Sequence, residues 1–177
     1  MMAASAAMTP AFWRSRRRYL AKCAVILAVI LIGGSVFKRY CFIGLDPQTV
    51  TSTGYRWYLV FRHSMPTSAG QYVAFHVDAR VEPRFHVGEV FLKRISCMYP
   101  CHVEETVDRL ALNGTSVPPL NLEVVAKLGH RPEDYVSTRD LLPGQMFVTG
   151  SYPRSFDSRY WGDVSATQVI GRAYPLY

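Results

Sequence analysis

The chain has 177 residues, about half of them apolar and 19% charged, with 20 Lys and Arg against 13 Asp and Glu. This composition is too apolar for a disordered basic tail, and the length is short for two independent domains. A formal net charge of +7 first suggests nucleic acid or an anionic membrane as a partner, and the positions of the basic residues decide between them.

The excess positive charge lies entirely in residues 1–39, which contain seven basic residues and no acidic one. The rest of the chain carries 13 basic and 13 acidic side chains, so a nucleic-acid surface is not expected there. The seven basic residues are Arg14, Arg16, Arg17, Arg18, Lys22, Lys38 and Arg39.

The first predicted element is a membrane-spanning helix over residues 19–37. A helix of this length rises about 28 Å, close to the thickness of the hydrocarbon core, and Lys22 can extend its ammonium to the head groups. Five basic residues lie on its N-terminal side or at that boundary, and two follow it. The positive-inside bias therefore predicts a basic cytoplasmic tail over residues 1–18, with the chain after the helix on the far side of the membrane.

A cleaved secretory signal is the competing interpretation of this segment. Gly33, Gly34 and Ser35 are small, but no A-x-A site follows them, and Lys38 and Arg39 stand where cleavage would fall. A buried core helix is disfavoured because no polar face runs along the segment. We therefore expect a retained anchor.

After a linker over residues 38–54, residues 55–177 are expected to form one mainly β domain. Apolar residues come there in short runs separated by Pro, Gly and Asn, and Asn113-Gly114 indicates a hairpin. Outside the anchor, only residues 132–135 indicate a helical turn. The predicted strands cover residues 55–61, 72–77, 89–95, 103–107, 109–112, 145–149 and 169–174, and 115–117 completes the hairpin.

Cys97 and Cys101 are separated by three residues and are followed by His102. In an oxidising compartment they could close a small disulfide-bonded loop, while free thiols and a metal site are the alternatives. A structural zinc site needs about four ligands, and the other histidines show no suitable spacing.

Three short segments carry candidate chemistry. Ser64 stands at the end of a predicted strand, before Met65 and Pro66, where neighbouring hydrogen bonds could fix the position of a nucleophile. Read alone, this tetrapeptide usually indicates only a turn.

The second segment contains Lys93. Strand alternation places Phe91, Lys93 and Ile95 on one face, so the lysine amine is expected among apolar side chains. Such a setting disfavours the ammonium and suits a general base, although an edge-strand lysine pointing to water is the simpler interpretation.

The third segment, residues 150–162, is rich in hydroxyl groups. Asp157 and Arg159 are placed to pair, with Ser155 just before them and aromatic residues after them. Taken alone, it could be a structured surface loop held by that ion pair.

Together the three segments resemble the type I signal peptidases, which are membrane-anchored serine proteases with a Ser/Lys dyad. Ser64-Met65-Pro66 looks like the nucleophile motif, Lys93-Arg94 looks like the general-base motif, and residues 155–162 look like the family's S-x-D-S-R-Y/F-W/F-G motif. The short chain with one anchor is most similar to the TraF-like conjugative-transfer peptidases, which also favour a lead such as Tyr152-Pro153-Arg154 before the last motif.

The resemblance implies a signal-peptidase-like β fold and a division of roles. Ser64 would attack the scissile carbonyl, and neutral Lys93 would accept its proton. Ser155 would orient the Lys93 amine, while Asp157 and Arg159 would brace the loop. No metal or cofactor is implied.

The resemblance also implies exported preproteins as substrates, bound as an added strand, and a pilin precursor in the TraF-like case. The expected location is the bacterial inner membrane, with the N-terminus cytoplasmic and the catalytic domain periplasmic. Pilin cyclisation is a further outcome, in which the N-terminal amine of the substrate replaces water.

Two departures from the family pattern concern the nucleophile motif. The family commonly has one more residue between Met and Pro, and Arg62 stands where some members carry a hydroxyl that binds the oxyanion. The usual Gly-x-Pro-Gly-Asp turn after the lysine is also replaced, by residues 96–101.

Other functions remain open from the sequence. They are a housekeeping signal peptidase and a non-catalytic envelope subunit of a conjugation or secretion system. A self-cleaving repressor would need a DNA-binding domain in place of the membrane span.

Overall fold

The structure is a computed structural model that describes the backbone of residues 10–176 and the side chains of residues 16–176. The chain divides into two units, residues 1–40 and a second unit that begins at Cys41. Most of the predicted basic tail, residues 1–18, lies outside the part for which side chains are described.

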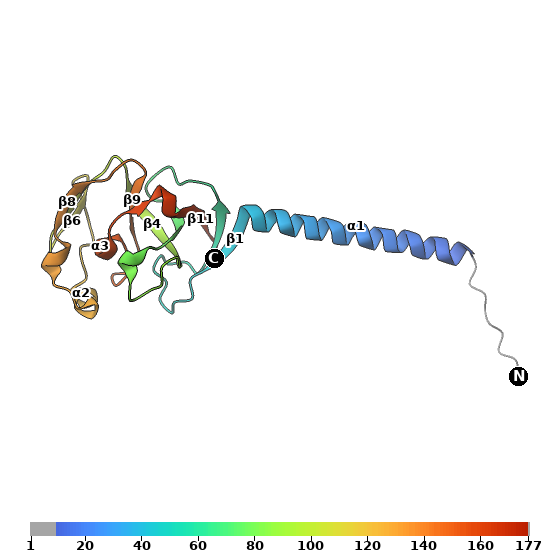
Figure 1. Cartoon of the computed structure of the whole chain (residues 1–177), viewed down its shortest axis with the longest axis horizontal. Coiled ribbons are helices and arrows are strands. Elements are labelled where there is room, and N and C mark those ends of the chain that lie inside the picture. Colours follow the sequence, from blue (N-terminus) through green and yellow to red (C-terminus); the bar gives the residue numbers. More distant parts are fainter. Residues whose placement is uncertain (1–9, 177) are drawn as a thin grey trace, which may run out of the picture. The chain divides into compact units, whose positions relative to one another are not determined.

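The first unit contains one long helix, α1 (Pro10–Tyr40), which is continuous through Gly33 and Gly34 (Figure 1). Residues Arg16–Tyr40 are long and apolar enough to cross a membrane by length and composition, a test that signal sequences also pass. Lys38 and Arg39 lie in the last turn, where positive charge interacts favourably with the helix dipole.

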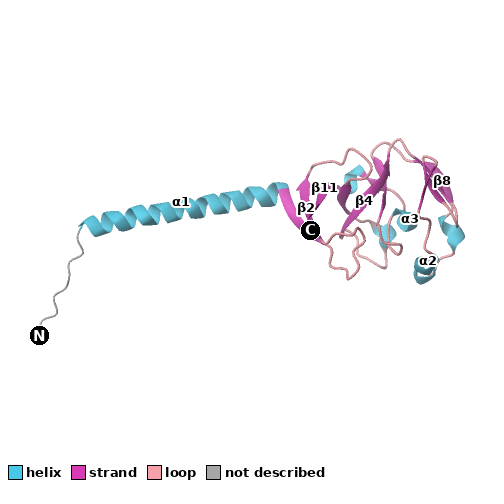
Figure 2. Cartoon of the chain, turned by 180° about the vertical axis from the view of Figure 1, so that it is seen from behind, coloured by secondary structure: helices cyan, strands magenta, loops and turns pink. Residues whose placement is uncertain are grey.

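The second unit is mainly β, as predicted (Figure 2). One sheet has seven strands in the order β1-β2-β11-β3-β4-β9-β10, and the other has four in the order β7-β6-β5-β8; each strand pairs antiparallel with its neighbours. The strands are β1 (Cys41–Leu45), β2 (Trp57–Arg62), β3 (Tyr72–His76), β4 (Val90–Met98), β5 (His102–Glu105), β6 (Leu110–Leu112), β7 (Thr115–Val117), β8 (Ser137–Asp140), β9 (Gln145–Thr149), β10 (Val164–Ser165) and β11 (Val169–Leu176).

Short helical elements cover the connections between strands. They are α2 (Leu122–Leu128), α3 (Ser158–Trp161) and the 3-10 turns η1 (Ala79–Val81), η2 (Pro132–Tyr135) and η3 (Ala166–Gln168). The helical turn expected at residues 132–135 is present as η2. The main core packs β3, β4 and β9 against α2 and α3 through residues such as Phe75, Val148 and Trp161.

The expectation that no helix other than this turn follows the anchor is wrong, because the short α3 and the longer α2 are both helices. Helix α2 is the clearer case. Its seven residues are too few for a clear apolar period, and its ends supply the signal instead. The Asn121 side chain accepts from the amides of Glu123 and Val124, and Gly129 ends the helix in the left-handed conformation at φ 73°.

Strands β1, β8 and β10 were also not predicted. The expected linker over residues 38–54 contains the end of α1 and all of β1. Strand β1 begins at the residue that follows the last residue of α1. Strand β8 consists of polar and charged residues, and β10 has only two residues, so neither shows an apolar pattern.

Cys97 and Cys101 form a disulfide where the chain passes from β4 of the large sheet to β5 of the small one. Both cysteines are buried together with Leu141 and Phe147. The structure thus contains the first of the three alternatives that the spacing left open. Among the described residues, no group of three or more His, Cys, Asp and Glu side chains is placed to hold a metal ion.

The small sheet contains a buried acid. Glu105 on β5 is 3% exposed, and its Oε2 lies 3.8 Å from Arg139 Nη1 on β8. Arg139 is engaged by Asp163 at 2.9 and 3.1 Å, and Oε1 of Glu105 has no hydrogen-bond partner in the described part of the chain. Burial raises the pKa of Glu105 to about 7, although Arg139 opposes this shift.

This acid predicts a pH-dependent stability. Between pH 4.5, the ordinary pKa of Glu, and about 7, the folded protein retains a proton that the unfolded chain has lost. The free energy of unfolding should therefore fall by about 3 kcal/mol as pH rises through this window. Denaturant unfolding of the full chain in detergent should show this fall, and Glu105→Gln should remove it. Glu104→Gln is the matched control, because the Glu104 side chain is 43% exposed; an unchanged slope in Glu105→Gln would contradict the prediction.

Candidate active site

The loop between β9 and α3 is held by a buried ion pair. Arg159 and Asp157 are 2% and 0% exposed, and the guanidinium donates to both carboxylate oxygens at 2.8 Å. Asp157 also accepts from the amide of Gly150 at 2.9 Å, and Arg159 donates to the carbonyl oxygens of Ser155 and Pro119. The pair predicted from the sequence therefore closes this loop on itself and fixes the backbone at Ser155.

Lys93 lies in the middle of β4 and points into the same region. It is 6% exposed, and its Nζ donates to Ser155 Oγ at 2.9 Å. Burial lowers the pKa of Lys93 to about 8, against the opposing effects of the Asp157 and Asp46 carboxylates. An amine with this pKa is partly neutral near neutral pH, as a general base requires.

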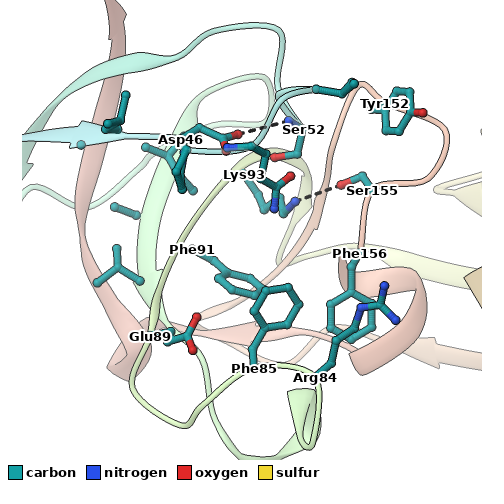
Figure 3. A pocket seen from close by; sticks show the side chains of 18 of the residues that line it. Asp46, Ser52, Arg84, Phe85, Glu89, Phe91, Lys93, Tyr152, Ser155 and Phe156 are labelled. Atoms are coloured by element: carbon teal, nitrogen blue, oxygen red, sulfur yellow. Dashed lines mark hydrogen bonds between the residues drawn. The ribbon is translucent and has the colours of Figure 1, made fainter. Parts of the chain in front are cut away.

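A cavity of about 520 Å³ opens beside Lys93 (Figure 3). Lys93 and Ser155 line it together with aromatic residues that include Phe85, Phe91 and Phe156. The ring of Phe85 packs edge-on against Phe91 and is stacked with Phe156. The cavity thus combines a polar group of buried side chains with an apolar wall, an arrangement typical of a site that binds a peptide or another organic ligand.

A second serine, Ser52, also lines this cavity. Ser52 is 6% exposed and lies in the loop between β1 and β2. Its amide donates to Asp46 Oδ2 at 3.2 Å, and its carbonyl oxygen accepts from the amide of Ser151 at 2.6 Å. The backbone of the Ser52 loop is therefore bound to the loop that carries Ser155.

The two loops meet at Gly150. A Cβ added there would lie 2.1 Å from Ser155 Oγ and 2.6 Å from the carbonyl oxygen of Ser52, so both residues approach the same backbone position. Since Ser155 Oγ binds Lys93 Nζ, the fold brings Ser52, Lys93 and Ser155 together (Figure 3). No cluster of three or more His, Cys, Asp and Glu side chains that could hold a metal accompanies them within the described residues.

The structure does not bring Ser64 to this group. Its amide donates to the carbonyl oxygen of Phe61, and its own carbonyl oxygen accepts from Arg172 on β11. In the sheet register, Phe61 is opposite Arg172, Arg172 is opposite Val73, and Val73 is opposite Lys93. Strands β11 and β3 therefore lie between Ser64 and β4, and Ser64 is not among the residues that line the cavity.

Sequence reasoning missed Ser52, although two signals weakened Ser64. The spacing between Met65 and Pro66 lacked one residue, and Arg62 occupied the position expected for a hydroxyl. Ser52 itself lies between Thr51 and Thr53, and no local pattern distinguishes it from a residue of an ordinary polar loop. Ser52 is recognised as part of the site only in the folded structure, where residues 150–155 pack on it.

Comparison with known proteins identifies the family of the chain. Residues 16–177 match the family model described as signal peptidase, peptidase S26. The chain belongs to this family. A signal peptidase I from Leptolyngbya laminosa is 29% identical over 114 residues, which cover 63% of this chain and 53% of that protein. The chain thus spans about half the length of this curated relative.

Among solved structures, a signal peptidase I from Enterococcus faecalis V583 is 26% identical to this signal peptidase family member. The match covers 62% of this chain and 97% of that one, with a TM-score of 0.37. The membership in the signal peptidase family therefore rests on the family model, which spans nearly the whole chain.

Proposed function

We propose that this chain is a membrane-anchored serine endopeptidase that removes signal or leader peptides from exported preproteins. The observation that carries the proposal is a buried lysine amine, held by Ser155, in the same cavity as Ser52. Membership in the signal peptidase family supports a serine peptidase. In this proposal Ser52, rather than Ser64, is the nucleophile, because Ser52 shares the cavity with Lys93.

In the acylation step, neutral Lys93 accepts the hydroxyl proton of Ser52 while Ser52 Oγ bonds to the scissile carbonyl carbon. The tetrahedral intermediate collapses as the C–N bond breaks, and the Lys93 ammonium returns the proton to the leaving amine. The Ser52 amide is the expected first donor to the oxyanion. Water, with its proton taken by Lys93, then attacks the acyl carbon. The bond from that carbon to Ser52 Oγ breaks, and Lys93 returns the proton to Ser52 Oγ.

The remaining residues of the proposed site have supporting roles. Ser155 accepts a hydrogen bond from Lys93 Nζ and so sets the direction of the amine. The Asp157–Arg159 pair holds the backbone at Ser155 and takes no part in proton transfer.

Helix α1 supports a single membrane anchor over residues 19–37. We assign the N-terminus to the cytoplasm and the β unit to the periplasmic face of a bacterial inner membrane, because the basic residues are concentrated before the apolar run.

For the substrate, we propose a conjugative pilin precursor. The short chain and the Tyr152-Pro153-Arg154 lead into Ser155 support a TraF-like member of the family. A housekeeping signal peptidase is the second candidate, since the relative from Leptolyngbya laminosa is named signal peptidase I. Hydrolysis and cyclisation of the pilin differ only in whether water or the N-terminal amine attacks the acyl-enzyme.

The test is co-expression with the pilin precursor, followed by intact mass measurement of the pilin. Wild type and Lys127→Ala should yield shortened pilin, because Lys127 is an exposed lysine on α2. Lys93→Ala should leave the precursor uncut, and processing by this variant would overturn the proposal. A product lighter than the linear pilin by one water indicates cyclisation. Rescue of a strain depleted of its own signal peptidase would favour the housekeeping function.

A further inference from the structure

The loop that carries Ser52 is closed by one carboxylate. Asp46 directly follows β1, and its amide donates to the carbonyl oxygen of Arg56 at 2.9 Å. Its Oδ1 accepts from the amide of Gln48 at 3.1 Å, and its Oδ2 accepts from the amide of Ser52 at 3.2 Å. Asp46 also lines the cavity, and Figure 3 shows its carboxylate directed at the Ser52 backbone.

These contacts give Asp46 a role that the proposed mechanism does not use. The Ser52 amide is the group expected to bind the oxyanion, yet in this structure it donates to a carboxylate. We propose that Asp46 is a positioning residue, which holds the Ser52 backbone in the substrate-free enzyme and yields the Ser52 amide to the scissile carbonyl oxygen. The proposal rests on Ser52 being the nucleophile.

The surroundings of the loop make such an anchor necessary. Residues 47–50 are exposed and form no helix or strand, so little packing fixes the backbone before Ser52. On the other side, the Ser52 carbonyl oxygen is bound by Ser151. Asp46 therefore supplies the anchor on the N-terminal side. A nucleophile misplaced by about 1 Å can lose roughly 100-fold in rate.

Charge repulsion explains why the Ser52 amide must change its acceptor from the Asp46 carboxylate to the substrate oxygen. An oxyanion that formed beside the Asp46 carboxylate, on the same N–H, would be repelled by it. The carboxylate must therefore turn away from Ser52 when the substrate carbonyl arrives. Its bond to Gln48 can keep it at the base of the loop meanwhile.

Asp46 also acts on Lys93 through its charge. The charged groups that bear on the Lys93 amine are Asp157, Asp46 and Arg159, and the two carboxylates favour the ammonium form and raise the pKa of Lys93 against the larger effect of burial. Replacing Asp46 with a neutral residue should lower the pKa of Lys93 further. Because the mechanism needs neutral Lys93, activity should then begin at a lower pH.

The test compares Asp46→Asn with wild type in the full chain, using a fluorogenic peptide that spans the cleavage site. We expect kcat to fall about tenfold with KM within twofold, and the acidic limb of the kcat profile to move from about pH 8 to a lower pH. Hydrogen exchange of a peptide covering residues 47–55 should be faster in Asp46→Asn.

Asp78→Asn is the matched control, because Asp78 accepts from the amide of Arg80 in the same way but does not line the cavity. Asp78→Asn should change neither the acidic limb of the kcat profile nor the hydrogen exchange of residues 47–55. An unchanged kcat and an unmoved limb in Asp46→Asn would overturn the role of Asp46. If Ser52→Ala remains active, the nucleophile assignment fails instead, so the two failures are distinguishable.

Discussion

Ser52→Ala should abolish peptide cleavage, lowering kcat/KM by roughly 10³-fold or more, as loss of a serine nucleophile does in other serine proteases. Ser64→Ala should retain activity within a few-fold of wild type, since strands β11 and β3 separate Ser64 from Lys93. The measurement is steady-state cleavage of a fluorogenic signal-peptide substrate by purified full chain in detergent.

The two serine variants also control for each other. Ser52 precedes strand β2 and Ser64 follows it, and each replacement removes one hydroxyl group. Unfolding curves should show that both variants are folded at the assay temperature. An inactive Ser64→Ala together with an active Ser52→Ala would return the nucleophile role to Ser64, as the sequence motif suggested.

Removing one partner of the Asp157–Arg159 pair should have the largest effect on stability. Arg159→Met leaves the Asp157 carboxylate buried without its cation, so the free energy of unfolding should fall by about 3–5 kcal/mol. Arg131→Met is the matched control, because the side chain of Arg131 is 81% exposed in its ion pair with Asp134, and the loss of an exposed pair should cost far less.

Denaturant unfolding in detergent measures both losses. The double variant Asp157→Leu with Arg159→Met should recover part of the stability, because no uncompensated charge stays buried. Equal losses in Arg159→Met and Arg131→Met would contradict the view that this ion pair holds the loop.

The parts of the site that lie within one segment could be predicted from the sequence. Strand alternation predicted an apolar environment for Lys93, and Lys93 is buried beside Ile95. The pairing of Asp157 with Arg159 was also predicted, because both side chains belong to one short motif. The mainly β fold followed from the short apolar runs and the turns between them.

What the sequence could not supply is the contact between distant loops. Ser52 becomes a candidate nucleophile only because residues 150–155 pack on its backbone. No residue type within residues 46–56 predicts that contact. The same holds for β8, whose polar residues form a strand because β5 offers them a partner. Strand β1 was hidden for another reason, since it follows the last residue of α1 without a turn.

The close approach at Gly150 limits how this site can change during evolution. Even a methyl group would overlap the Ser155 hydroxyl and the Ser52 carbonyl oxygen, neither of which lies at the end of a long, flexible side chain. Mutation could therefore alter the aromatic residues of the cavity far more freely than this one backbone position. We therefore expect substitutions in homologous proteins to be rare at residue 150, because a side chain there would push the two loops apart.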